Sequence, residues 1–127
     1  MDTRFGEYVR VKRLEKEISL RKLAEKLEIV PAYMSDIENA RRYPPDKDKI
    51  YKIAEELSLT DAETNELFDF AALAKDNSVS PDLPEYIMGT EKARVALRMA
   101  RDNQVGDEVW MKVIEMLEAE DKGDSKD

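Results

Sequence analysis

The sequence predicts an all-α protein, and three observations support this fold class. Apolar residues recur at the three- and four-residue spacing of a helix, whereas the alternation that is typical of strands does not recur. Only four glycines interrupt the chain of 127 residues. A hydrophobic fraction of 42% is enough for a core, so we expect one compact domain with an appendage.

Two helices are predicted near the start of the chain. The first covers residues 3 to about 17 and places Phe5, Val9 and Arg13 on one face, so a charged residue ends an apolar stripe. The second is capped by Ser19. Its apolar residues have the i, i+3, i+4, i+7 spacing and are Leu20, Leu23, Ala24 and Leu27.

The third predicted helix begins at Pro31, because proline suits the first turn, and it ends before a pair of prolines. Glu38 shares the inner face of this helix with Met34 and Ile37. An unpaired charge near a core is costly, whereas an arginine–carboxylate pair is tolerated there. We therefore predict that Arg13 of the first helix forms an ion pair with Glu38.

Two more helices complete residues 1–75. Asp46 is the expected N-cap of a fourth helix that runs through about Leu57. Thr60 and Glu63 have the spacing of a capping box, which predicts the start of a fifth helix.

The rest of the chain is predicted to be a linker, two helices and a tail. Residues 76–90 contain two prolines and a glycine and are predicted to be a linker with one helical turn at "PEYIM". Thr90 and Asp107 begin two helices, which form a C-terminal extension over residues 91–120. Residues 121–127 are low in apolar content and are predicted to be disordered.

The composition excludes several classes of function. The chain has no cysteine and no histidine, which excludes disulfides, thiolate or imidazole metal sites and catalysis by either side chain. Carboxylates at helix ends are explained by capping, so we expect no enzyme activity, catalytic residue, cofactor or metal. Neither a signal peptide nor a run of 18 apolar residues is evident, so we expect a cytoplasmic protein that does not contact membranes.

The charge of the chain is unevenly distributed. A formal net charge of −8 argues against a nucleic-acid partner, because phosphate attraction is the sequence-independent part of such binding. Residues 1–45, however, carry ten basic and eight acidic side chains, whereas residues 46–127 carry eleven and twenty-one. The acidity therefore lies in the second part of the chain.

The outer face of the third helix is made of small and mostly uncharged residues. Such side chains let a helix backbone approach another surface closely, as a helix in the DNA major groove must do. Arg41 and Arg42 follow the helix and suit flanking phosphates. By wheel geometry alone, a binding face and a plain solvated face are equally supported for Ala32, Ser35, Asp36 and Asn39.

The stretch "ISLRKLAEKLEIVPAYMSDIENARRYPP" closely resembles the helix-turn-helix of the Xre family, the group of the phage lambda Cro protein and repressor. The resemblance extends over residues 5 to about 59 and rests on "LRKLAEKL", "I-x-P-x-Y-M-S-x-I-E" and "RR-x-P". It implies a five-helix, lambda-repressor-like domain in residues 1–75 that binds double-stranded DNA as a homodimer on an inverted-repeat operator. It also implies that Arg13 and Glu38 are the family's structural ion pair.

The resemblance assigns two sets of site residues by position. Ala32 is expected to touch a thymine methyl group, and Asp36 to accept from a cytosine amino group. For Asp36, a solvated acid beside Lys22 or Arg21 is a nearly equal alternative. The base-reading set is Pro31, Ala32, Ser35 and Asp36. The set expected on the DNA backbone is Arg21, Tyr33, Asn39, Arg41 and Arg42.

The sequence departs from the family pattern in several places. Leu20 stands where a glutamine often grips a phosphate, and Val30 where a Ser or Thr cap is common. Glu28 and Ala40 stand where glycine is frequent. These departures indicate a weaker or more selective binder, whose affinity depends on dimerisation and on Arg21, Arg41 and Arg42.

Residues 76–127 lie outside the resemblance. The last helix carries an apolar stripe, and its simplest explanation is packing against the preceding helix or the fifth helix. The alternative is a dimer or partner interface, since Trp and Met are favoured in interfaces. The residues concerned are Val109, Trp110, Val113, Ile114 and Leu117.

Three functions are consistent with these observations. The first is a transcriptional regulator, most simply a repressor. The second is the antitoxin of a toxin–antitoxin pair, which represses its own operon and binds a basic toxin, or a peptidase, through its acidic C-terminal region. The third is a protein-interaction module that has lost DNA binding. The negative net charge and the presence of Leu20 favour this alternative.

Overall fold

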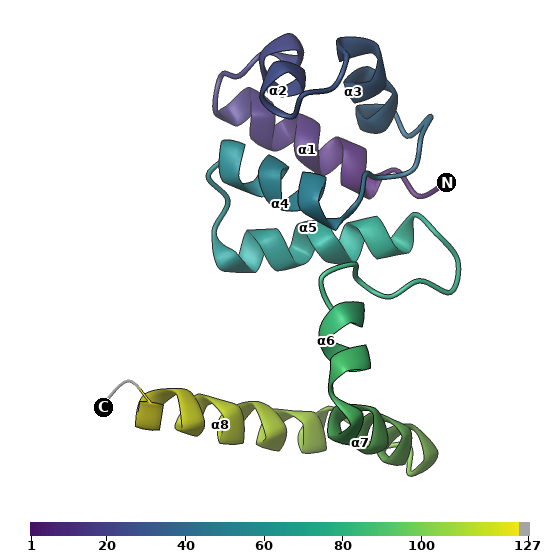
Figure 1. The fold of residues 1–127 in the computed structure, drawn as a ribbon, viewed down its shortest axis with the longest axis vertical. Helices are drawn as coiled ribbons and strands as arrows, with labels where there is room; N and C mark the ends of the chain where they lie inside the picture. The colour runs from purple at the N-terminus through teal and green to yellow at the C-terminus, as the bar shows by residue number, and fades with distance from the viewer. Residues whose placement is uncertain (125–127) are drawn as a thin grey trace. The chain divides into compact units, whose positions relative to one another are not determined.

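The computed structural model describes residues 1–124, and within them the chain forms eight α-helices and no strand (Figure 1). The predicted all-α class is confirmed. The chain divides into two compact units, Met1–Tyr86 and a second one that begins at Ile87. The first unit contains α1 (Arg4–Glu15), α2 (Leu20–Lys26), α3 (Pro31–Glu38), α4 (Lys47–Glu56) and α5 (Asp61–Leu73). Then follow α6 (Pro84–Gly89), α7 (Glu91–Asp102) and α8 (Asp107–Asp124).

The first unit has one hydrophobic core that all five of its helices share. α1 packs against α3 and α5, α2 packs against α3 and α4, and α4 packs against α5 (Figure 1). Each helix contributes its apolar stripe to this core, because burial of such a stripe is what stabilises an amphipathic helix in a globular protein. The largest fully buried side chains are Phe5, Val9, Leu23, Leu27, Met34, Ile37, Ile50, Ile53, Leu57, Leu67 and Phe68.

The N-termini of these helices are capped largely as their residue types predict. Ser19 and Asp46 accept hydrogen bonds from the backbone N–H three residues later, each at 3.0 Å. Thr60 and Glu63 form a complete capping box. Glu63 also accepts from Lys12 Nζ at 2.6 Å, which joins α5 to α1. The Lys12 hydrogen bond, followed by the Thr60 backbone N–H, lowers the pKa of Glu63 to about 2.

The C-termini of the first four helices each lead into a residue in the left-handed region. Glu28 after α2 has φ 58° and Ala40 after α3 has φ 57°. The residue that follows each of them donates a hydrogen bond back into the last turn: Ile29 N to Ala24 O and Arg41 N to Asp36 O. This is the closing pattern that glycine favours, and here side chains with a Cβ adopt it.

Ala40→Gly is expected to raise the free energy of unfolding by about 0.5–1 kcal/mol, because glycine adopts this conformation without the clash of a Cβ. Urea denaturation followed by circular dichroism measures the change. The matched control is Glu25→Gly, at an exposed helical position in the last turn of α2, where the same residue type should cost up to about 1 kcal/mol. An Ala40→Gly variant that loses stability as Glu25→Gly does would contradict the expectation.

The first unit extends further along the chain than residue 75, so most of the predicted linker belongs to it. Ser80 Oγ donates to the carboxylate of Asp69 on α5, and Lys47 Nζ lies 2.5 Å from Glu85 Oε2. Both contacts hold residues 76–86 against the domain. They join segments that are distant in the sequence, and local composition therefore does not reveal them.

The C-terminal helices also differ from the sequence prediction in extent. α6 covers the segment for which one helical turn is predicted, so three helices follow α5 where the prediction has two and a turn. α8 continues to Asp124, past the predicted boundary at residue 120. A run of Glu, Ala and Asp lacks the apolar groups needed for a core, but this does not prevent it from continuing a helix. The remainder of the predicted tail, residues 125–127, lies outside the described residues.

The second unit has no buried residue between Ile87 and Asp121. On α8, the relative exposure is 36% for Trp110, 44% for Ile114 and 61% for Leu117. Val109 is also exposed and Val113 is partly exposed. Packing of α7 and α8 within one copy of the chain therefore leaves the apolar stripe of α8 largely uncovered. Among the helices of residues 1–124, none is long and apolar enough to cross a membrane.

Candidate nucleic-acid interface

The helix α3 is anchored by its inner face, which leaves its opposite face open. Met34 and Ile37 are buried in the core, and Pro31 provides the first turn in place of a side-chain cap. The turn between α2 and α3 is held by Leu27, which is buried, and by Ile29, which packs against the core. The two helices therefore form a fixed helix–turn–helix unit.

Arg13 and Glu38, the two charged residues that helical spacing places on inner faces, contact one another in the structure. Arg13 Nε donates to Glu38 Oε2 at 2.8 Å, and Arg13 Nη2 donates to Oε1 at 3.0 Å. A third bond runs from Arg13 Nη1 to the carbonyl oxygen of Ile18 at 2.9 Å. The hydrogen bonds that Arg13 donates to the Glu38 carboxylate raise the pKa of the guanidinium against the opposing effect of burial. The pair joins α1 to the C-terminal end of α3.

Gly6 brings the backbone of α1 against the same end of α3. A Cβ at this position would lie 2.4 Å from the carbonyl oxygen of Glu38 and 2.5 Å from that of Ile37. Only a residue without a side chain permits such an approach between two backbones. Helical spacing did not predict this close approach, although a glycine inside a predicted helix was an available signal.

The predicted base-reading residues lie together on the open face of α3. Ala32 is exposed, and Pro31, Ser35 and Asp36 are partly exposed. The face is narrow because the side chains are short, so nothing on it keeps the helix backbone away from a partner surface. This geometry is what insertion of a helix into the major groove requires.

The residues predicted to contact the DNA backbone flank this face. The guanidinium of Arg42 lies over the ring of Tyr33, with Cζ 5.9 Å from the ring centroid. Arg41 Nη1 lies 3.7 Å from Asp36 Oδ1, so a positive charge lies close to the acidic residue on the open face of α3. Arg21 is exposed one residue into α2. Leu20 beside it packs against the core, which explains how the helix accommodates leucine at the position where the family often has glutamine.

Asn39 is held by a second arginine, Arg10, which is not among the site residues predicted from the sequence. Arg10 Nη2 donates to Asn39 Oδ1 at 2.5 Å, and Arg10 Nε lies 3.6 Å from Glu38 Oε1. Asn39 Nδ2 in turn donates to the carbonyl oxygen of Ser35 at 2.9 Å and to its Oγ at 3.3 Å. The spacing of Arg10 and Arg13 on one side of a helix was the signal that could have revealed this contact.

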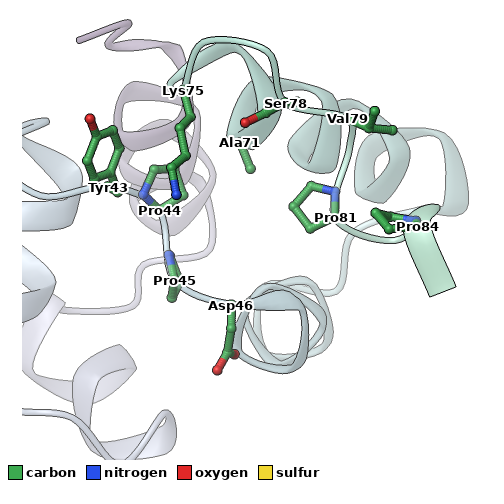
Figure 2. A pocket seen from close by; sticks show the side chains of 11 residues that line it. Tyr43, Pro44, Pro45, Asp46, Ala71, Lys75, Ser78, Val79, Pro81 and Pro84 are labelled. Atoms are coloured by element: carbon green, nitrogen blue, oxygen red, sulfur yellow. The ribbon is translucent and has the colours of Figure 1, made fainter.

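A surface cavity of about 400 Å³ lies beside the segment that follows the two arginines (Figure 2). Its walls come from residues 43–46, the end of α5 and residues 78–84. Lys75 Nζ lies 5.5 Å from the ring centroid of Tyr43. Prolines at 44 and 45 restrict the backbone here, so Arg41 and Arg42 are followed by a constrained segment.

Fold and geometry together define a helix-turn-helix DNA-binding domain. The family model described as Helix-turn-helix matches residues 9–63, which confirms for this part of the chain the resemblance stated from the sequence. The class that residues 9–63 define is that of DNA-binding transcriptional regulators with a helix-turn-helix.

Two solved proteins show a likeness to this chain. The clp gene regulator ClgR from Corynebacterium glutamicum is 22% identical, with a TM-score of 0.46 over 61% of this chain and 95% of that one. The SinR protein/SinI protein complex contains a chain that is 19% identical, with a TM-score of 0.46 over 93% of this chain and 98% of that one. At these identities the likeness concerns the fold alone. No curated protein matches the chain.

Proposed function

We propose that the protein is a sequence-specific transcriptional repressor that binds an inverted-repeat operator as a homodimer, with α3 in the major groove. The observation that carries the proposal is the arrangement of α3: its inner face is buried and ion-paired, and its outer face is short, open and flanked by arginines. A repressor needs only to occupy its operator, and the compact first unit provides a rigid element for that purpose.

Within this proposal the two sides of the interface have different roles. Ala32 contacts a thymine methyl group and Asp36 accepts from a cytosine amino group, whereas Arg21, Tyr33, Arg41 and Arg42 meet phosphates. An acidic side chain near phosphates is repulsive, and the nearby guanidinium of Arg41 offsets part of this repulsion. Asp36 therefore contributes to selectivity more than to affinity.

The test is fluorescence-polarisation binding to the DNA upstream of the protein's own gene, at about 50 and 200 mM salt. Affinity should fall with salt, and the Arg41→Ala/Arg42→Ala variant should bind more weakly with a slope of log K against log [salt] reduced by about 2. The matched control is Lys52→Ala/Lys92→Ala, which removes two exposed charges outside α2 and α3. The control should retain the wild-type slope.

Two results would count against the proposal. An absence of binding even at about 50 mM salt would favour the interaction-module alternative, which Leu20 and the negative net charge also support. If the arginine variant and the lysine control lose DNA affinity equally, the overall charge of the protein governs binding, and not the two arginines after α3.

The homodimer in this proposal is supported by the second unit. α7 and α8 border an apolar hollow of about 270 Å³, which includes Ala100, Val109, Trp110 and Val113 in its lining. α7 carries four basic and two acidic residues, whereas α8 carries two basic and seven acidic ones. In a two-fold dimer, α7 of one copy therefore meets α8 of the other with opposite charge, and the exposed stripe becomes covered.

We expect the full chain to be dimeric and a truncation after Tyr86 to be monomeric, as measured by light scattering or sedimentation. All the core residues precede this point, so the truncated chain should retain its fold. Ile114→Asp, which places a charge in the exposed stripe, should weaken the dimer without removing the helices. A monomeric full chain would contradict the homodimer and favour the antitoxin alternative, in which the acidic α8 binds a basic partner.

A further inference from the structure

Arg10 determines which way the side-chain amide of Asn39 faces. A guanidinium can only donate hydrogen bonds, so the group 2.5 Å from Arg10 Nη2 must be the amide oxygen of Asn39. The amide nitrogen then faces the preceding turn of α3. Arg10 is itself held near Glu38, whose carboxylate is buried by the pair with Arg13.

Asn39 in turn constrains the hydroxyl group of Ser35. Asn39 Nδ2 lies 3.3 Å from Ser35 Oγ and can only donate, so one lone pair of the hydroxyl is occupied. The hydroxyl hydrogen cannot point at this donor. Within residues 1–124, no protein acceptor takes this hydrogen, and Ser35 lies on the open face of α3. The hydrogen is therefore available to an external acceptor.

We propose that the chain of contacts from Arg10 through Asn39 to Ser35, the Arg10 relay, sets Ser35 as a hydrogen-bond donor toward DNA. An unconstrained serine pairs with either kind of group on a base edge. Under the Arg10 relay, Ser35 reads an acceptor in the major groove, which is a purine N7, guanine O6 or thymine O4, and discriminates against the amino groups of adenine and cytosine. The inference rests on the proposed function and adds a rule for one base position.

In this scheme Arg10 is a positioning residue, because it acts on the base through Asn39 and Ser35. Its own charge also attracts phosphates, since its side chain is 42% exposed. A loss of affinity in an Arg10 variant would therefore not identify its role. The distinguishing readout is the base preference at one position, which a purely electrostatic contribution does not change.

The experiment begins with selection of duplexes from a random library by the wild-type chain and by Ser35→Ala. The position at which Ser35→Ala alone relaxes the preference is the position that Ser35 reads. The wild-type chain should prefer an acceptor there by about fivefold, the effect of one hydrogen bond. If adenine is selected, its 7-deaza analogue, which lacks the N7 acceptor, should bind about as weakly as the disfavoured base. If guanine is selected, weaker binding of 7-deazaguanine identifies N7 as the acceptor, and unchanged binding identifies O6.

Three variants then test the Arg10 relay at that position. Asn39→Asp removes the donor, so the hydroxyl of Ser35 turns toward the carboxylate and presents its lone pairs to DNA; the preference should shift to a base with an amino group. Arg10→Met frees the Asn39 amide to rotate and should reduce the preference to less than about twofold. Arg10→Lys keeps a donor and should retain it. Circular dichroism verifies that each variant is folded.

The outcomes separate the inference from the function on which it rests. If the wild-type chain enriches no sequence, the proposed function fails and the inference fails with it. If it enriches an operator but Ser35→Ala changes no base preference, or Asn39→Asp keeps the acceptor preference, only the inference is overturned. A uniform loss of affinity in Arg10→Met, with base preferences unchanged, limits Arg10 to an electrostatic role and overturns the relay.

Discussion

Glu38→Leu is expected to lower the free energy of unfolding by about 3–5 kcal/mol, because it leaves the Arg13 guanidinium without its carboxylate in a site that water barely reaches. Arg13 is 8% exposed and Glu38 is 2% exposed, and two hydrogen bonds of 2.8 and 3.0 Å join them. Arg13→Met should cost less than Glu38→Leu, since Arg10 at 3.6 Å still partly balances the charge of Glu38. Urea denaturation gives both values.

The double variant Arg13→Met/Glu38→Leu shows whether the loss comes from stranded charge. It should be more stable than either single variant, because apolar groups of similar volume fill the site without an unpaired ion. The exposed pair of Lys47 and Glu85 is the control, and Lys47→Met should change stability far less, since Glu85 is largely solvated. If the losses of the two single variants simply add, the stranded-charge explanation is wrong.

Gly6→Ala should lower the free energy of unfolding by about 1–3 kcal/mol. It should do so although alanine favours a helix over glycine by about 1 kcal/mol. The added Cβ would lie 2.4 and 2.5 Å from two backbone carbonyl oxygens of α3, and backbone atoms cannot rotate away as a side chain can. α1 and α3 would have to move apart. The variant should also bind DNA more weakly, because the displaced end of α3 carries Asn39 and Arg41.

Gly106→Ala is the matched control for this prediction. It makes the same chemical change at a position where a Cβ would meet no atom within 4 Å. Thermal unfolding of the two variants should therefore give a large decrease in Tm for Gly6→Ala and little change for Gly106→Ala. Equal behaviour of the two variants would contradict the close approach of α1 and α3.

These expectations share a physical origin at the end of α3. Glu38 faces the core and its neighbour Asn39 faces outward, and Arg10 contacts both. The contacts of Glu38 that stabilise the domain are thus adjacent to the contacts of Asn39 that orient side chains on the open face of α3. Substitutions in the buried pair should therefore affect recognition as well as stability, whereas Arg41 and Arg42, which are exposed, should affect binding alone.

The features that the sequence by itself determined are those that depend on neighbours along the chain. Helical spacing, the caps at Ser19, Asp46 and Thr60, and the proline in the first turn of the third helix all act within a few residues, so their patterns are visible without a fold. The pairing of Arg13 with Glu38 could also be inferred, because two charges on inward faces need one another. The assignment of α3 as the helix that contacts DNA bases came from the resemblance to the Xre family.

Only the tertiary structure decided which distant segments meet. The approach of Gly6 to α3, the contact of Arg10 with Asn39 and the attachment of residues 76–86 to the first unit each join parts of the chain that local patterns treat separately. The same holds for the exposed stripe of α8, since periodicity shows that a helix has an apolar face but not what covers it. The physical reason is that packing depends on distances in space, which the order of residues specifies only through the complete fold.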